Sequence, residues 1–125
     1  MKLILQNVAV HSFKLENNLT KEGEIKLEIK VDCNTSVQND NVTAVAKCTV
    51  TGAVSPDSGS LDIELVLNAI FQCDGEFDER ESGKESLLQL HPYLRAYIAA
   101  FSGTAGLPPI HIPPISGDEL NAKQE

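Results

Sequence analysis

The chain has 125 residues, a length that fits a single domain spanning residues 1–125 with one modest core. Its composition is 42% hydrophobic and 22% charged, which is typical of a globular protein, and its formal net charge is −8. This acidic balance argues against non-specific binding to nucleic acid or to anionic membranes, because both need a basic surface.

The cysteines and the N-terminus indicate the compartment. Cys33, Cys48 and Cys73 lie far apart and form no CxxC pair, and an odd number of separated cysteines is typical of reduced thiols. The apolar run at the N-terminus stops at Gln6 and Asn7, which is too short for a signal peptide or a membrane span. We therefore expect a cytoplasmic protein without membrane insertion.

The first part of the chain predicts strands. An irregular strand is expected over residues 6–16, with a bulge between Val10 and Phe13 where the alternation of apolar residues slips. After a polar loop, residues 24–33 alternate strictly between apolar and charged side chains. This period of two predicts a strand with one face in water.

The middle of the chain predicts the rest of an antiparallel sheet. Asparagine and aspartate at positions 39–41 are turn formers, and residues 41–54 are rich in valine and threonine, so a hairpin is expected there. Residues 55–60 predict a second turn. A further long strand is expected over residues 61–73, with its odd-numbered positions facing the core.

The outward face of this last strand carries two apolar residues, Val66 and Ile70. They fit a sheet whose second face is partly covered by another subunit or by a ligand. Single exposed apolar residues are also common on ordinary surfaces, so both interpretations stay open.

A helix follows an acidic segment. Residues 74–85 predict a solvated loop, since their acids do not match a calcium-binding loop. From Ser86 the apolar period changes to 3.6, and Pro92 is expected to kink or restart the helix before Gly103 and Gly106 end it. The predicted buried stripe of this helix consists of Leu87, Leu90, Leu94, Tyr97, Ile98 and Phe101.

The proline-rich segment after the helix predicts an extended strip, because each residue before a proline is driven to extended geometry. Ser116 and Glu119 form a capping-box pattern that predicts a short C-terminal helix. The layout predicts an α+β fold: a four-stranded antiparallel sheet with a long C-terminal helix, a proline-rich extended strip and a short second helix. The apolar area of the strip is supplied by Leu107, Ile110, Ile112 and Ile115.

The residue types that carry out catalysis or hold metals show no recognised arrangement. His11, His91 and His111 lack the spacing of a zinc-binding helix, and nothing marks a Cys–His dyad. The glycine-containing segment at residues 103–106 follows a helix, whereas a phosphate-binding loop precedes one. We expect no catalytic residue, no metal and no cofactor.

The segment "LHPYLRAYIAAF", residues 90–101, resembles the PYxRxxI helix of the SecB family of protein-export chaperones. The family continues with a glycine, an extended proline-containing segment of apolar residues and a second helix, as this chain does from Gly106 onward. Residues 6–16 are also similar to the family's first strand. The departures are a short tail after Ser116 and few aromatic residues. The motif positions of the helix match Pro92, Tyr93, Arg95 and Ile98.

The resemblance implies a twisted four-stranded sheet with helices on one face and a homo-oligomer, either a dimer or a tetramer. It also implies binding of unfolded polypeptide in apolar grooves, without nucleotide or metal. Val66, Ile70 and the apolar residues of the strip are then expected to contact polypeptide or another subunit. A translocation motor or an antitoxin is a further expected partner. The alternative is an adaptor of SecB-like fold that binds one specific client and has no general chaperone role.

Overall fold

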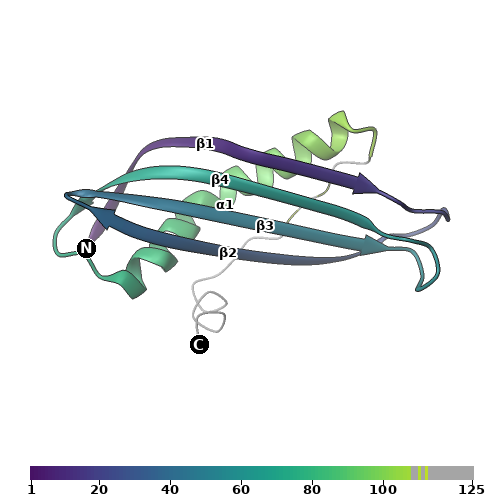
Figure 1. Ribbon diagram of the computed structural model, residues 1–125, viewed down its shortest axis with the longest axis horizontal. Coiled ribbons are helices and arrows are strands. Elements are labelled where there is room, and N and C mark those ends of the chain that lie inside the picture. Colours follow the sequence, from purple (N-terminus) through teal and green to yellow (C-terminus); the bar gives the residue numbers. More distant parts are fainter. Residues whose placement is uncertain (108–109, 111, 113–125) are drawn as a thin grey trace.

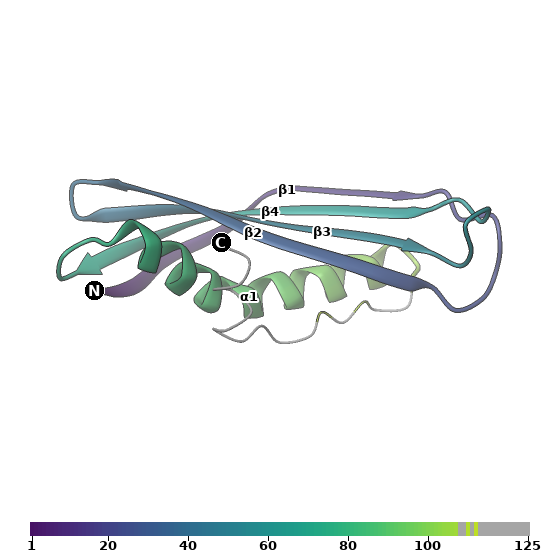
Figure 2. The same ribbon diagram turned by 90° about the horizontal axis from the view of Figure 1, so that it is seen from below.

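The protein is described by a computed structural model, which covers residues 1–107, 110 and 112. In these residues four long strands precede one helix, and the strands form a single antiparallel sheet in the order β1-β4-β3-β2. The helix runs diagonally across one face of the sheet (Figures 1 and 2). This arrangement confirms the predicted α+β fold with its four-stranded antiparallel sheet and long helix, while the predicted second helix and most of the predicted proline-rich strip lie outside the described residues. The elements are β1 (Lys2–Asn17), β2 (Lys26–Gln38), β3 (Asn41–Ala53), β4 (Leu61–Asp74) and α1 (Glu79–Thr104).

Strand β1 is longer and less regular than β2. It begins at Lys2, before the predicted start at residue 6, because Leu3 pairs with Cys73 on β4 and buries its side chain. The β1–β4 register shifts between Val10 and Ser12, which confirms the predicted bulge. A second shift, between Leu5 and Asn7, was not expected from the sequence.

The hairpin of β2 and β3 turns where the sequence predicted it. Gln38 pairs with Asn41, and Asn39 between them has a φ of 57°, a left-handed conformation that asparagine tolerates better than most residues. The predicted end of the second strand at residue 33 was too early. The polar residues 34–38 stay paired with β3 without a register shift, so the strand continues to the turn.

The core lies between α1 and the inner face of the sheet. The alternation predicted for β4 is confirmed, since its odd-numbered residues 61–71 are all buried. From the helix, the predicted stripe contributes side chains that are buried or half-buried. Complete burial of one leucine or isoleucine contributes roughly 1.5–3 kcal/mol. The largest fully buried side chains include Phe71, Leu61, Ile63, Leu65, Leu67, Leu90, Leu94 and Ile98.

Helix α1 begins earlier than the sequence predicted, at Glu79 instead of Ser86. Asp78 is the N-cap, and its Oδ1 accepts hydrogen bonds from the backbone N–H groups of Arg80 (3.0 Å) and Glu81 (3.1 Å). The acids that indicated a loop are well placed in a first helical turn, where the helix dipole favours negative charge. Most of the predicted loop at residues 74–85 is therefore helix.

The helix continues through Pro92 as one element, ends at Thr104 and is followed by the C-cap Ala105 and by Gly106. Gly106 has a φ of 87°, the N–H of Gly106 donates to the carbonyl of Gly103, and the N–H of Leu107 donates to that of Ser102. These two bonds form a Schellman motif. The predicted restart at Pro92 is not observed. The predicted role of Gly106 in ending the helix is confirmed, whereas Gly103 lies inside the helix.

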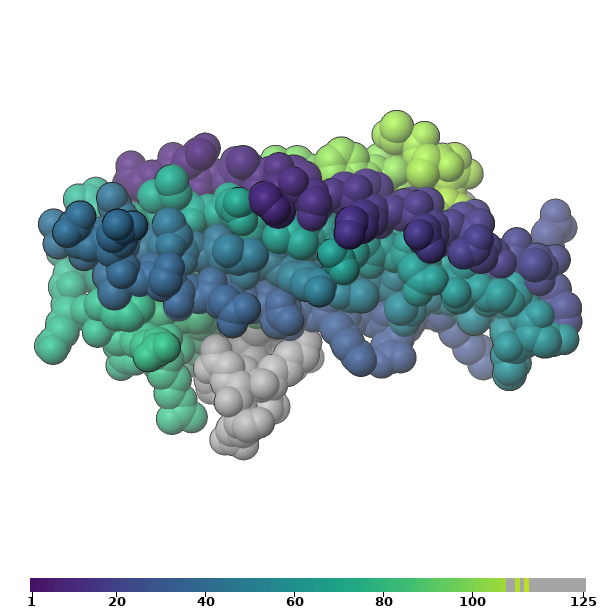
Figure 3. Space-filling view, viewed as in Figure 1, coloured from purple at the N-terminus to yellow at the C-terminus, as the bar shows by residue number. Residues whose placement is uncertain are grey.

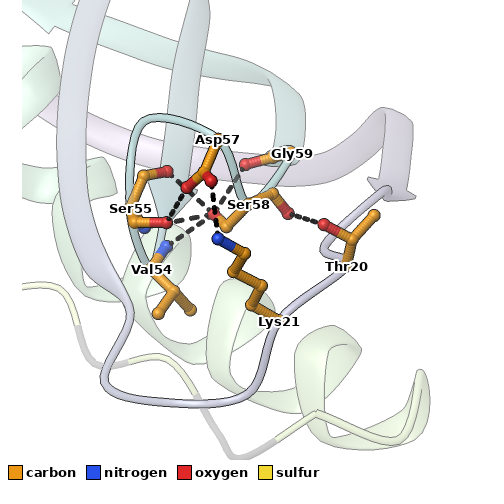
Figure 4. Close-up of polar contacts among 7 residues, drawn as sticks. All are labelled: Thr20, Lys21, Val54, Ser55, Asp57, Ser58 and Gly59. Carbon is orange, nitrogen blue, oxygen red and sulfur yellow. Dashed lines mark hydrogen bonds and ion pairs between the residues drawn. The ribbon is translucent and has the colours of Figure 1, made fainter.

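Two loops are joined at the end of the sheet by a buried serine (Figure 4). The Oγ of Ser58 accepts hydrogen bonds from the N–H groups of Val54 and Ser55, and the carbonyl of Ser58 accepts from the N–H and the hydroxyl of Thr20. A Cβ atom at Gly59 would collide with the carbonyl oxygen of Asn18. The β1–β2 loop is thus fixed against the β3–β4 turn.

Candidate functional site

Two features of the described residues bear on catalysis. In residues 1–107, 110 and 112, no group of three histidine, cysteine or acidic side chains is placed to hold a metal ion. Burial, and secondarily the charge of Asp32, raises the pKa of the Cys33 thiol to about 12. A thiol that stays protonated is a poor nucleophile, so this cysteine is unsuited to covalent catalysis.

Within the same residues, no helix has the length and apolar character needed to cross a membrane.

The outer face of the sheet carries the predicted residues Val66 and Ile70. Ile70 is 40% exposed and Val66 is half-buried. The sequence analysis did not single out Val45 and Ile4, which share this face and are exposed to a similar extent. The alternation of residues 42–50 places Val45 opposite the buried positions, and this signal was present in the sequence.

Polar side chains interrupt the apolar ones on this outer face. Asn68 lies between Val66 and Ile70 on β4, and Thr43 on β3 pairs with Ile70. The amide nitrogen of Asn68 lies 3.4 Å from Nδ1 of His11, which belongs to the irregular part of β1. The outer face is therefore a mixed surface with isolated apolar side chains.

The described residues of the proline-rich strip lie elsewhere. Ile110 and Ile112 are 7% and 2% exposed and belong to the core, and Leu107 packs against it. The N–H of Ile110 donates a 3.0 Å hydrogen bond to the Oγ of Ser102, which ties the strip to the end of α1. The structure thus separates these residues from Val66 and Ile70, and Ile115 lies outside the described residues.

The residues of the family motif take different environments on α1. Ile98 is fully buried, whereas Pro92, Tyr93 and Arg95 are exposed. Tyr93 is 37% exposed, so its ring can meet a partner molecule.

Aromatic side chains gather where the second half of α1 meets β1. The ring centroid of Phe101 lies 4.7 Å from that of Phe13 on β1 and 5.7 Å from that of Tyr97 one turn earlier. All these rings are half-buried, so each keeps part of its surface in water. In Figures 1 and 3 the end of α1 projects past the edge of β1.

Further apolar side chains extend this cluster along both elements. Val8 and Val10 lie on the same side of β1 as Phe13, and Tyr93 precedes Tyr97 by one helical turn. Arg95 is the one charged side chain among residues 86–107. We call the set the aromatic surface, which consists of Val8, Val10, Phe13, Tyr93, Tyr97 and Phe101.

The aromatic surface concentrates the aromatic residues of a chain that has few of them. The sequence contains four phenylalanines, two tyrosines and no tryptophan, and both tyrosines and half of the phenylalanines lie on this surface. Aromatic rings supply large contact areas and are enriched at the centres of interfaces. The sequence analysis missed this surface because the bulges of β1 hide which residues share a face.

Comparison with known proteins gives a likeness in fold. No protein-family model matches the sequence, and no curated protein matches it. A SecB-like chaperone of Mycobacterium tuberculosis, solved in complex with a ChAD peptide from the HigA1 antitoxin, superposes with a TM-score of 0.75 at 14% identity. The match covers 91% of this chain and 90% of the chaperone.

A second solved structure is a protein of unknown function from Streptococcus agalactiae, with a TM-score of 0.51 at 16% identity. That match covers 90% of this chain and 98% of the other. The strand order, the diagonal helix and the superposition agree with the resemblance found in the PYxRxxI segment. This protein has the SecB-like fold.

Proposed function

We propose that this protein binds extended, apolar segments of polypeptide on the aromatic surface, as a chaperone without ATP that acts in the cytoplasm. The observation that carries the proposal is the gathering of the half-buried rings of Phe13, Tyr97 and Phe101 at the β1 edge of a SecB-like fold, where part of each ring stays open to water. A contiguous apolar area of this kind on a soluble protein is typical of an interaction site.

The chemistry of the surface favours an unfolded polypeptide over a charged ligand. The second half of α1 offers Arg95 as its single charge, and Tyr93 and Tyr97 combine apolar rings with polar hydroxyl groups. Such side chains bind apolar residues and still accept hydrogen bonds from a peptide backbone. No catalytic step, metal or cofactor is part of this proposal.

A homo-oligomer, a dimer or a tetramer, belongs to the same proposal. Val66 and Ile70 on the outer face are proposed as a second contact area, for polypeptide or for another subunit. The buried positions of Ile110 and Ile112 support a role in shaping the core, and their contact with a client, like that of Ile115, remains a prediction.

A second candidate function is that of an adaptor for one specific partner. The support is that the Mycobacterium tuberculosis neighbour was solved with a peptide from an antitoxin. An antitoxin segment, or a component of a translocation motor, would then be the partner of this chain. Such an adaptor would not protect unrelated unfolded proteins.

Light scattering of a denatured client separates the two candidates. The protein is added in stoichiometric amounts, without nucleotide, to several unrelated proteins as they are diluted from denaturant. A general chaperone lowers the scattering of all of them. Unchanged scattering with every client, together with a single partner recovered by affinity capture, would favour the adaptor.

A further inference from the structure

The first two turns of α1, residues 79–86, are held on the sheet differently from the rest of the helix. Their buried side chains are both serines, Ser82 and Ser86, whereas the following turns bury Leu87, Leu90 and Leu94. Burial of one such leucine favours the docked state about tenfold or more, and a serine has far less apolar area to bury. The first two turns therefore lack the apolar anchoring of the remainder of α1.

The polar contacts of these two turns are incomplete. The Oγ of Ser82 donates to the carbonyl of Glu79 (2.8 Å) and lies 2.7 Å from the Oγ1 of Thr35 on β2, so the Thr35 hydroxyl is the donor in this second bond. The Oγ of Ser86, one turn later, is buried and has no hydrogen-bond partner among the described residues. A buried hydroxyl without a partner favours any state in which water reaches it.

A cavity and a glycine weaken the same segment. An open cavity of about 350 Å³ lies between β2 and the start of α1, where Asn34, Glu79, Arg80 and Gly83 are among the residues that line it. Gly83 stands inside the helix, and glycine is a poor helix former because its backbone has many alternative conformations. Water therefore already reaches the side of the segment that faces β2, and the segment itself forms a weak helix.

We infer that residues 79–86 form a lid that opens as one unit, while Leu87 and the rest of α1 stay docked on the sheet. Opening separates Ser82 from Thr35 and uncovers the inner face of the sheet beside the β2–β3 hairpin, the end at which Figures 1 and 2 place the start of α1. Ala44 pairs with Thr35 and is 1% exposed when the lid is closed. The open state therefore adds apolar surface at this end of the sheet.

The neighbours of Thr35 on β2 define how far the lid acts. Val37, the next residue on the inner face, is 45% exposed even when the lid is closed, so the newly uncovered surface joins one that is already open. Cys33, on the other side of Thr35, packs against the core, which the docked part of α1 keeps closed. The lid is a property of the free chain and is independent of whether the aromatic surface binds polypeptide.

Hydrogen exchange of the full chain, resolved to single amides, measures the lid. The amides of residues 83–90 donate to carbonyls four positions earlier, so opening of residues 79–86 frees them together. They should share one opening constant, at least about a hundredfold larger than that of residues 95–102, which open only when the fully buried Leu94 and Ile98 leave the sheet. An opening constant that falls gradually from residue 83 onward is ordinary fraying of a helix end and would overturn the lid.

Two substitutions should hold the lid closed. Gly83→Ala strengthens the helix and should lower the opening constant of residues 83–90 about fivefold. Ser86→Ala removes the hydroxyl that lacks a partner and should lower this constant about fivefold or more. Gly103→Ala is the matched control, because it changes the exposed last turn of the same helix and should leave these amides unchanged. The lid is overturned if neither Gly83→Ala nor Ser86→Ala lowers the opening constant, or if residues 83–90 exchange as slowly as residues 95–102.

Discussion

The ring of Phe13 on β1 lies 4.7 Å from the ring of Phe101 on α1, at an interplanar angle of 54°. This tilted contact joins the irregular edge strand to the end of the helix, and the ring of Tyr97 stacks with that of Phe101 at a centroid distance of 5.7 Å. The contact holds the second half of α1 on the sheet and forms the centre of the aromatic surface.

The stability of this contact can be measured by truncating Phe101. Phe101→Ala should lower the free energy of unfolding by about 2–3 kcal/mol, less than the 3–5 kcal/mol typical of fully buried phenylalanine, because the ring is half-buried. Denaturation in urea measures the change. Tyr93→Ala is the control, and its more exposed ring should cost less than about 1 kcal/mol. Equal losses for the two variants would contradict the packing described.

The tie between the strip and the helix depends on Ser102. Ser102→Ala would leave the buried N–H of Ile110 without its hydroxyl acceptor and should destabilise the protein by about 1–3 kcal/mol. Thr104→Ala removes a hydroxyl of the same helix whose bond to the carbonyl of Ala100 is exposed, and it should change stability by less than about 0.5 kcal/mol. If both substitutions change the free energy of unfolding by an equally small amount, the packing of the strip against the helix does not depend on the Ser102 hydroxyl.

The early start of α1 depends on its N-cap. Asp78→Ala should lower the free energy of unfolding by about 0.5–2 kcal/mol. Asp78→Asn keeps an acceptor oxygen at the N-cap and should therefore retain most of the stabilisation that the cap provides. Circular dichroism during thermal unfolding measures both variants. If alanine is tolerated as well as asparagine, the helix does not need this cap.

The thiol of Cys33 should be protected in the folded protein. Burial raises its pKa to about 12, so it stays protonated at pH 8 and should react with iodoacetamide only when the protein unfolds. Because the folded state holds this proton more tightly than the unfolded state, its contribution to stability is constant below about pH 9. That contribution is lost as the pH rises toward about 12.

Mass spectrometry of peptides after labelling tests this protection. Labelling of Cys33 in native buffer at the rate of a thiol in the unfolded chain would contradict the burial. In the Cys33→Ala variant, the free energy of unfolding should no longer include the decrease between about pH 9 and pH 12 that this thiol causes.

The fold was largely predictable because its strands alternate clearly. The inner positions of β3 and β4 follow a period of two, and Leu90, Leu94 and Ile98 follow the period of a helix. Local charge misled the prediction at the start of α1, where the acids of residues 79–81 favour a helix once Asp78 caps it. Pro92 misled it in the same sense, because a restart was expected there and the structure has a single helix whose residues Leu90 and Leu94 are fully buried on both sides of the proline.

The candidate site was less predictable, because it depends on contacts between distant segments. Phe13 and Phe101 are separated by most of the chain, and two register shifts in β1 decide which residues join Phe13 on one face. By contrast, Val66 and Ile70 were located correctly on the outer face by simple alternation. A pattern within one strand is visible in a sequence, whereas a surface built from two elements is not.

The central claim, that the aromatic surface binds unfolded polypeptide, is tested most directly by titration calorimetry with reduced, carboxymethylated α-lactalbumin, which stays unfolded. We expect binding that Tyr93→Ser weakens about tenfold or more, since an aromatic contact at the centre of an interface contributes on the order of 2 kcal/mol. The matched control Leu88→Ser, on the first half of α1 and 37% exposed like Tyr93, should leave the affinity within about twofold. Absence of binding by the native protein, or loss of binding in Leu88→Ser with full retention in Tyr93→Ser, would contradict the claim.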